Sequence, residues 1–230
     1  MGSTRLPGKT LKDVGGQSML ARVARRTCRA EQVSEVVVAT TTNPGDAAIV
    51  EECRRLGFSV FRGDEQDVLN RYHDAAGEYG AGAVVRITSD CPLIDPQVID
   101  KVITRFLEEG ADYASNVLQR TYPRGLDTEV MLRSALDRAW REAGEAYQRE
   151  HVTPYICENP GLFKLLSVPH TADYSALRWT VDTAEDLELV RAVYAALGNG
   201  DEFGWEQALR IFASRPELAL INRGVAQKER

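Results

Sequence analysis

The sequence contains no long run of apolar residues. No stretch approaches the roughly 18 consecutive apolar residues of a membrane-spanning helix, and the first residues lack the apolar core of a signal peptide. We therefore expect a cytoplasmic chain that has no membrane partner.

Cysteine is scarce as well. The four cysteines, Cys28, Cys53, Cys91 and Cys157, form no C-x-x-C pair, and no histidine stands near them at the spacing of metal ligands. We predict neither a disulfide nor a structural zinc site.

Positive charge is in the minority, with 28 Lys and Arg against 34 Asp and Glu and a net charge of −6. Nucleic acids and acidic membranes are bound by a broad basic face, so this balance argues against both as partners. The 230 residues, 43% of them hydrophobic, suffice for one substantial core with a small appendage.

The sequence does contain a regular alternation of two apolar patterns. Helical spacing predicts helices over residues 20–27, 46–56, 68–79 and 96–109, and apolar, often β-branched runs predict strands over 33–40, 58–61 and 83–88. We expect the strand over 33–40 to be buried on both faces. Strands that alternate with helices predict the α/β class, with a mostly parallel, twisted sheet that carries helices on both faces.

The alternation loosens after Tyr113. A strand is expected at 129–132, and helices are expected around 136–140, over 147–156 and from Thr183 to about 197. Thr183 and Asp186 have the spacing of a cap at the start of the last of these helices.

The chain opens on a glycine-rich loop, MGSTRLPGK. Gly2 and Gly8 let the backbone turn sharply and approach an anion, which its N–H groups can bind while Arg5 and Lys9 neutralise charge. Arginine grips phosphate bidentately and lysine binds it as a point charge, so the pattern predicts a polyphosphate site. A Walker A loop is rejected because its first glycine would stand at Ser3. A surface turn with incidental charges is the structural alternative.

A phosphate loop of an open α/β sheet normally follows the first, central strand. That strand would precede Met1. We therefore expect that the first strand is missing from this sequence and that Met1 lies inside a longer natural chain.

Acidic residues end two apolar stretches. Asp90 follows the strand expected at 83–88, and Asp182 follows Arg178-Trp179-Thr180-Val181. On one rim of the sheet they could hold Mg²⁺, which takes one or two carboxylates besides waters and phosphate oxygens. The alternatives are a turn role for Asp90 before Pro92 and a helix-cap role for Asp182.

Several ordered segments resemble one family: MGSTRLPGK, VVATTTNPGD, QDVLNRYHDAA, VRITSDCPLIDP, YPRGLDTEV, REHVTPYI and LRWTVDTAEDLELV. From Met1 to about Leu197 the chain resembles the SpsF-type cytidylyltransferases, named for spore-coat polysaccharide biosynthesis. Their superfamily includes the synthetases of CMP-activated sugar acids and has a nucleotide-diphospho-sugar transferase fold of the GT-A or Rossmann-like type. Members usually carry Gln-Ala-Arg before Met-Gly-Ser, so an arginine expected at the phosphates is also missing.

The resemblance implies transfer of CMP from CTP to a sugar, an acidic one, with release of pyrophosphate and with Mg²⁺ on Asp90 and Asp182. Arg5, Lys9, Asp90 and Asp182 would be catalytic. The residues around CTP and the sugar would be Gly2, Ser3, Thr4, Arg5, Gly8, Lys9, Thr40, Thr41, Arg71, Tyr122, Arg124, Asp127 and Glu129. The last four of these, from Tyr122 to Glu129, would face the sugar, and Arg178 and His151 would either support them or contact the substrate. The resemblance also implies a homodimer, because members of the family form dimers.

The same resemblance implies a nucleotidyltransferase domain over residues 1–200. Its nucleotide-binding half would cover about 1–110 and its sugar-binding half about 111–200, and a helical extension would follow over 201–230. Two alternatives stay open. A glycosyltransferase of the same architecture would use a nucleotide sugar and release no pyrophosphate, and a catalytically silent partner subunit would fit the missing strand.

Overall fold

The computed structural model describes residues 3–226. Met1 and Gly2, which belong to the predicted phosphate loop, lie outside the described residues. The strands are β1 (Asp13–Val14), β2 (Gln17–Ser18), β3 (Val37–Thr41), β4 (Ser59–Gly63), β5 (Ala83–Arg86), β6 (Tyr113–Ser115), β7 (Glu129–Leu132) and β8 (Leu165–Ser167). The α-helices are α1 (Met19–Cys28), α2 (Ala47–Leu56), α3 (Val68–Glu78), α4 (Pro96–Glu109), α5 (Arg133–Glu142), α6 (Ala146–His151), α7 (Pro154–Glu158), α8 (Ala184–Ala196), α9 (Trp205–Ser214) and α10 (Leu218–Ile221). Two short 3-10 helices are η1 (Lys9–Leu11) and η2 (Pro44–Asp46).

The α/β class is confirmed, and the sheets combine parallel and antiparallel ladders. Strands β3 and β4 pair in parallel, and β5-β7-β6-β8 form a four-stranded sheet in which β6 and β8 are parallel. Strand β7 is antiparallel to both of its neighbours, so the expectation of a mostly parallel sheet fails at β7. The reason is the connection from β6: no helical crossover lies between these strands, and a returning loop joins antiparallel strands.

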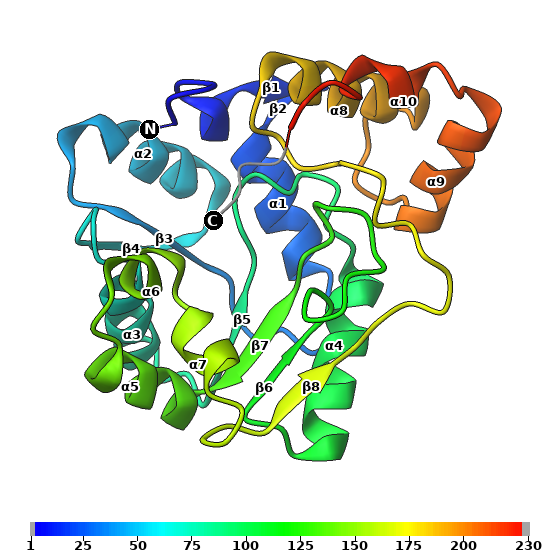
Figure 1. Ribbon diagram of the computed structural model, residues 1–230. Coiled ribbons are helices and arrows are strands. Elements are labelled where there is room, and N and C mark those ends of the chain that lie inside the picture. Colours follow the sequence, from blue (N-terminus) through cyan, green and yellow to red (C-terminus); the bar gives the residue numbers. More distant parts are fainter. Residues whose placement is uncertain (1–2, 227–230) are drawn as a thin grey trace.

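Helices cover both faces of the four-stranded sheet, as predicted (Figure 1). In the ladder of β6 and β7, Ala114 stands opposite Val130 and Tyr113 opposite Met131. The first pair packs with residues of α1 and α4, and the second pair packs with residues of α3 and α5. Successive residues of a strand point to opposite faces, so this alternation builds one apolar layer on each side.

Two expectations for individual elements were wrong. The single helix expected over 147–156 is two helices, α6 and α7, because the chain turns at Val152 with a φ of 72° and Pro154 begins a new helix. Strand β3 begins at Val37 and is largely half-buried rather than buried on both faces. Within residues 3–226 it has one ladder partner, β4, so one edge of it lacks a neighbouring strand.

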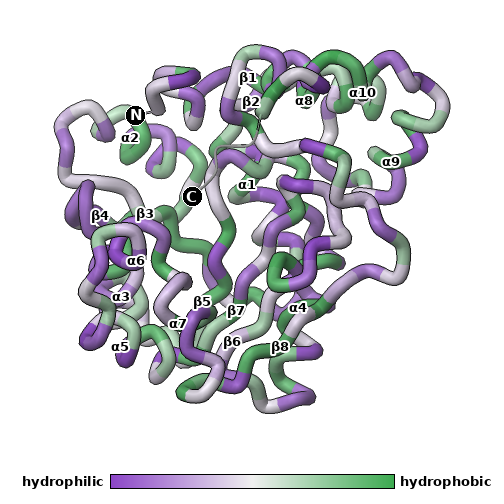
Figure 2. Tube along the Cα trace, viewed as in Figure 1, coloured by the Kyte–Doolittle hydropathy of each residue, from purple (hydrophilic) through white to green (hydrophobic). Residues whose placement is uncertain are grey.

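The helices near the C-terminal end share a core with the segment that leads to Asp182. Trp205 and Phe212 of α9 and Leu218 of α10 are buried together with Trp179 and residues of α8. The Trp179 and Phe212 rings stack with their centroids 5.5 Å apart. In Figure 2, α10 is coloured as hydrophobic, in keeping with its sequence Leu-Ala-Leu-Ile. The described part of the segment 201–230 therefore packs into the same core as the residues before it.

None of the helices in the described part of the chain is long and apolar enough to cross a membrane.

Candidate active site

Leu6 anchors the opening loop in the core, and the loop turns at Gly8. Leu6 is buried in the core that contains Trp179, and its N–H donates to Ser3 Oγ over 3.3 Å. Gly8 has a φ of 67°, a left-handed conformation that glycine adopts without strain, and Lys9 begins η1 directly after it. The Lys9 side chain is only 14% exposed as a result, although the loop itself lies at the surface.

Lys9 joins the two predicted metal aspartates. Its ammonium donates to Asp90 Oδ2 at 2.9 Å, to Asp182 Oδ1 at 2.8 Å and to the Val181 carbonyl oxygen at 3.0 Å. These contacts use the three donors that a lysine has. Burial would lower the pKa of Lys9, but the two carboxylates raise it above its ordinary value, so Lys9 is a cation at neutral pH.

Asp90 lies beyond the carboxyl end of β5, and its backbone is paired with the segment before Asp182. The Asp90 carbonyl accepts hydrogen bonds from the Val181 N–H at 2.8 Å and from Thr180 Oγ1 at 3.2 Å. Its side chain accepts from Thr88 Oγ1 at 2.6 Å. Two acidic residues far apart in the sequence are thus brought together by hydrogen bonds between the Asp90 carbonyl and the two residues before Asp182.

Asp182 is surrounded by positive charge. Besides Lys9, it accepts from the Arg178 guanidinium at 2.7 Å and forms an ion pair with Arg5 at 3.1 Å. Burial would raise the pKa of Asp182, but its hydrogen bonds with Lys9 and Arg178 and the charge of Arg5 lower it below its ordinary value. Asp182 is therefore a carboxylate at neutral pH.

The two carboxylates have the chemistry that a magnesium site requires. A single cation, the Lys9 ammonium, contacts both of them within 3 Å. Mg²⁺ accepts one or two carboxylates and completes its shell with waters and substrate phosphate oxygens. No group of three or more His, Cys, Asp or Glu side chains that could hold a metal occurs within residues 3–226, so two protein carboxylates would have to suffice here.

Three of the residues predicted near the nucleotide lie at one end of the β3–β4 ladder. Thr40 and Thr41 both donate their hydroxyl protons to Asp46, each over 2.7 Å. Arg71 of α3 packs beside Gly63, the partner of Thr41 in the ladder, and donates to the Asp64 carbonyl. Because the two strands are parallel, the three side chains share the edge where both strands end. Thr4 is exposed in the opening loop.

The loop predicted to face the sugar packs against the chain that leads to Asp182. The Arg124 N–H donates to the Leu177 carbonyl at 3.0 Å, and the Arg124 carbonyl accepts from Trp179 N at 2.6 Å. Gly125 has a φ of 108°, and a Cβ there would lie 2.7 Å from the Trp179 carbonyl carbon. The loop and the Asp182 segment are therefore joined by backbone hydrogen bonds and packed closely at Gly125.

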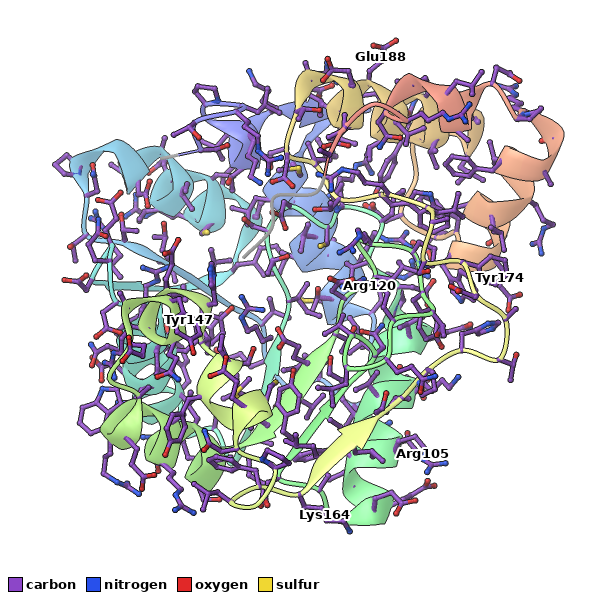
Figure 3. All side chains as sticks on the ribbon, in the orientation of Figure 1. Arg105, Arg120, Tyr147, Lys164, Tyr174 and Glu188 are labelled. Carbon is purple, nitrogen blue, oxygen red and sulfur yellow. The ribbon has the colours of Figure 1, made fainter. Side chains whose placement is uncertain are left out.

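Two side chains of this loop, over residues 122–127, have polar partners elsewhere in the protein. Asp127 forms a bidentate pair with Arg120 at 2.6 and 2.8 Å, and Figure 3 shows Arg120 near the middle of the view. Tyr122 is buried, and its hydroxyl accepts from Lys101 Nζ at 3.1 Å.

Glu129 lies inside the fold. Its carboxylate accepts from Tyr113 Oη at 2.6 Å and from Thr153 Oγ1 at 2.8 Å, and it pairs with Arg86 across the β5–β7 ladder. The side chain is 8% exposed. In this structure the carboxylate is engaged by these three buried partners, so a role of Glu129 toward the sugar stays a prediction.

Sequence reasoning missed two residues that support the site, Asp186 and Asn222. Asp186 was expected only as a helix cap, and it does cap α8 with Thr183. Its carboxylate also binds Arg178, which in turn binds Asp182. The spacing of the capping box marked the position of Asp186 but not this second role, and no local pattern marks Asn222.

Known proteins resemble this chain in sequence and in structure. A family model described as Cytidylyltransferase matches residues 1–202. The spore coat polysaccharide biosynthesis protein SpsF of Bacillus subtilis is 31% identical over 226 residues, which are 95% of this chain and 93% of that protein. A 3-deoxy-manno-octulosonate cytidylyltransferase of Geobacter sulfurreducens is 40% identical over 111 residues, 47% of this chain and 43% of that protein. A solved structure of a cytidylyltransferase from Leptospira borgpetersenii superposes with a TM-score of 0.92 at 33% identity, covering 100% of this chain and 95% of that one.

Proposed function

The chain belongs to the cytidylyltransferase family and is a nucleotidyltransferase, and we propose that it transfers CMP from CTP to a sugar acid with release of pyrophosphate. The name of the Geobacter relative, which matches about half of this chain, supports an acidic sugar as the acceptor. The name of SpsF supports a role of the product in a surface polysaccharide or glycoconjugate. We further propose that the reaction takes place in the cytoplasm, where nucleoside triphosphates are made, and that the enzyme is a homodimer.

One observation carries the proposal: Lys9 of the opening loop contacts both Asp90 and Asp182. Transfer of a nucleotidyl group depends mainly on alignment and on neutralisation of the charge that develops on the phosphates. The site combines cations from a phosphate-type loop with carboxylates of the kind that hold Mg²⁺. A site of this composition suits a triphosphate substrate and a pyrophosphate leaving group.

Each charged group has a proposed role. Arg5 and Lys9 bind the triphosphate and offset the charge of the departing pyrophosphate. Asp90 and Asp182 would hold Mg²⁺, which would supply further positive charge at the phosphate oxygens. The low pKa of Asp182 keeps it ionised for this role.

The acceptor sugar would lie on the side of the 122–127 loop. Arg124 is the residue of this loop whose side chain we propose for the acidic group of the sugar, because arginine binds carboxylates through paired N–H donors. Tyr122 and Asp127 would shape the same region, Asp127 through its pair with Arg120. The sugar hydroxyl attacks the α-phosphorus of CTP and loses its proton to solvent. The bond between the α-phosphorus and the oxygen that bridges to the β-phosphorus breaks, pyrophosphate leaves, and no covalent enzyme intermediate is needed.

The test is pyrophosphate release with CTP, UTP, GTP or ATP, Mg²⁺ and a panel of sugar acids. We expect release with CTP and one class of sugar acid, and a loss of about 100-fold or more in kcat for Asp90→Asn and for Asp182→Asn. Asp173→Asn is the matched control, because Asp173 lies in an exposed loop, away from Asp90 and Asp182 in the sequence, and accepts from Ser175. Consumption of a nucleotide sugar without pyrophosphate would identify a glycosyltransferase instead. Undiminished turnover in both site variants would contradict the assigned roles.

A further inference from the structure

The Asp182 carboxylate has partners on two sides. Its Oδ1 atom accepts from Lys9, whereas its Oδ2 atom accepts from the Arg178 guanidinium at 2.7 Å. The two oxygens thus have separate partners. Arg5 also lies 3.1 Å from Oδ2, but Arg178 is closer and far more buried, so we expect Arg178 to contribute most to the orientation in which Oδ1 is presented to Lys9.

Arg178 is in turn held by Asp186. Its Nε donates to Asp186 Oδ1 at 2.9 Å and its terminal nitrogen donates to Oδ2 at 3.1 Å, the paired geometry that restricts a guanidinium most strongly. The Asp186 side chain is fully buried. It also accepts from the backbone N–H groups of Asp182 at 2.9 Å and Thr183 at 3.1 Å, so it binds both the backbone of Asp182 and the arginine that orients its side chain.

Asn222 completes this chain of contacts from the other end of the sequence. Its amide nitrogen donates to Asp186 Oδ1 at 2.8 Å and to the Arg178 carbonyl at 3.0 Å, which uses both of its protons. Asn222 is 6% exposed and follows α10 directly. The last residue of α10, Ile221, lines an open cavity of about 390 Å³ together with Arg5 and Thr183, so this end of the chain borders the site.

The charges explain why an amide suits this position. The three cations Arg5, Lys9 and Arg178 are matched by the three carboxylates of Asp90, Asp182 and Asp186. A neutral donor satisfies the remaining acceptors without disturbing that balance. A further cation or anion in the same buried position would leave an uncompensated charge.

We propose that Asn222 is a positioning residue for the transfer reaction, acting on the Asp182 carboxylate through Asp186 and Arg178. This inference rests on the proposed function of the site. Without the Asn222 amide, Asp186 loses a donor, Arg178 gains freedom, and Asp182 is no longer held in one orientation toward Mg²⁺. CTP binding by Arg5 and Lys9 is expected to change little, because neither residue contacts Asn222.

A purely structural role of α10 is the competing explanation, and Leu218→Ala separates the two. Leu218 lies in the same helix and is buried in the same core as Trp179, but it makes none of the polar contacts of Asn222. Both Leu218→Ala and Asn222→Ala are expected to lower the melting temperature. Only the second removes a donor from the contacts that lead to Asp182.

The experiment compares these two variants with the wild-type enzyme at a temperature below all three unfolding transitions. For Asn222→Ala we expect kcat to fall and the half-saturating Mg²⁺ concentration to rise, each by about tenfold. Tenfold is the lower end of the effect that loss of a residue supporting a metal ligand has on activity or metal affinity. The KM for CTP should stay within about twofold. Leu218→Ala should change none of the three. Asn222→Ser, which keeps one hydroxyl donor, replaces Asn222→Ala if the latter does not fold, with a smaller effect in the same direction.

A second measurement separates the failure of this inference from the failure of the proposed function. It is the rise in melting temperature that Mg²⁺ adds in the presence of CTP, which requires no turnover. A wild-type enzyme that releases no pyrophosphate with any sugar acid would refute the proposed acceptor, while a weaker Mg²⁺-dependent rise in Asn222→Ala alone would still support the positioning role. The positioning role is overturned if Asn222→Ala matches the wild type in this rise and in its Mg²⁺ requirement, or if Leu218→Ala shifts both equally.

Discussion

Replacing Lys9 with methionine tests whether Asp90 and Asp182 form a cation site. Methionine has a similar length but no charge, so the substitution removes the ammonium while it keeps much of the packing. The two carboxylates then lie near each other without the cation that joins them. Arg5 and Arg178 remain on Asp182, whereas Asp90 loses its ionic partner.

The structure sets the size of the effect. The side chains of Lys9, Asp90 and Asp182 are 14%, 25% and 15% exposed, so these ion pairs are intermediate between fully buried pairs and surface pairs. Breaking a buried pair costs about 3–5 kcal/mol and an exposed pair contributes about 0.2–1 kcal/mol, so we expect a loss of about 2 kcal/mol. For a chain of this length that loss lowers the melting temperature by about 4–8 °C.

Mg²⁺ should reverse part of this loss. In Lys9→Met a divalent cation can occupy the position between the carboxylates, and at tenfold excess over its Kd it would stabilise the fold by about 1.4 kcal/mol, or about 3–6 °C. In the wild-type protein Mg²⁺ alone must displace Lys9, so its effect should be smaller. Lys164→Met is the control, because Lys164 is exposed and lies at the lower edge of the molecule in Figure 3.

The assay is thermal unfolding of the three proteins over a range of MgCl₂ concentrations, at constant ionic strength. The reasoning is refuted if Mg²⁺ stabilises Lys9→Met no more than it stabilises the wild type. A Lys9→Met protein that is as stable as the wild type without Mg²⁺ would show that Lys9 does not balance the two carboxylates.

Two further predictions concern the loop beside the site and the ionisation of Asp182. Gly125→Ala should destabilise the protein by about 1–3 kcal/mol, because its Cβ would lie 2.7 Å from the backbone of Trp179 and its φ is 108°. Urea unfolding against Gly144→Ala, where a Cβ meets nothing within 4 Å, measures this, and equal stability of the two variants would contradict it. The folded-state pKa of Asp182 lies below its ordinary value of 3.8, so its ionic contacts stabilise the fold above that pH and are lost as the pH falls through the lowered pKa. The loss of stability in Asp182→Asn should therefore be larger at pH 7 than at pH 3, and a difference from wild type that is independent of pH would argue against these contacts.

Local patterns predicted most helices and the type of fold. Thr183 caps α8 through a side-chain contact with the N–H group three residues away, so the sequence nearby contains the whole signal. The same holds for the helix stop at Gly110, which takes a left-handed conformation. The reversed direction of β7 was missed, because apolar periodicity gives the length of a strand and not its direction.

The sequence by itself determined the kinds of groups available: a glycine-rich loop with two cations, and two aspartates that each follow an apolar stretch. Their common location was an inference from the order of elements in an α/β fold. Only the tertiary structure decided that Lys9 contacts both carboxylates, that Glu129 is engaged inside the sheet, and that Asn222 contacts Asp186 and Arg178. The physical reason is range: caps and turns are made by neighbours in the sequence, whereas these contacts join residues that only the packing of the whole core brings within hydrogen-bond distance.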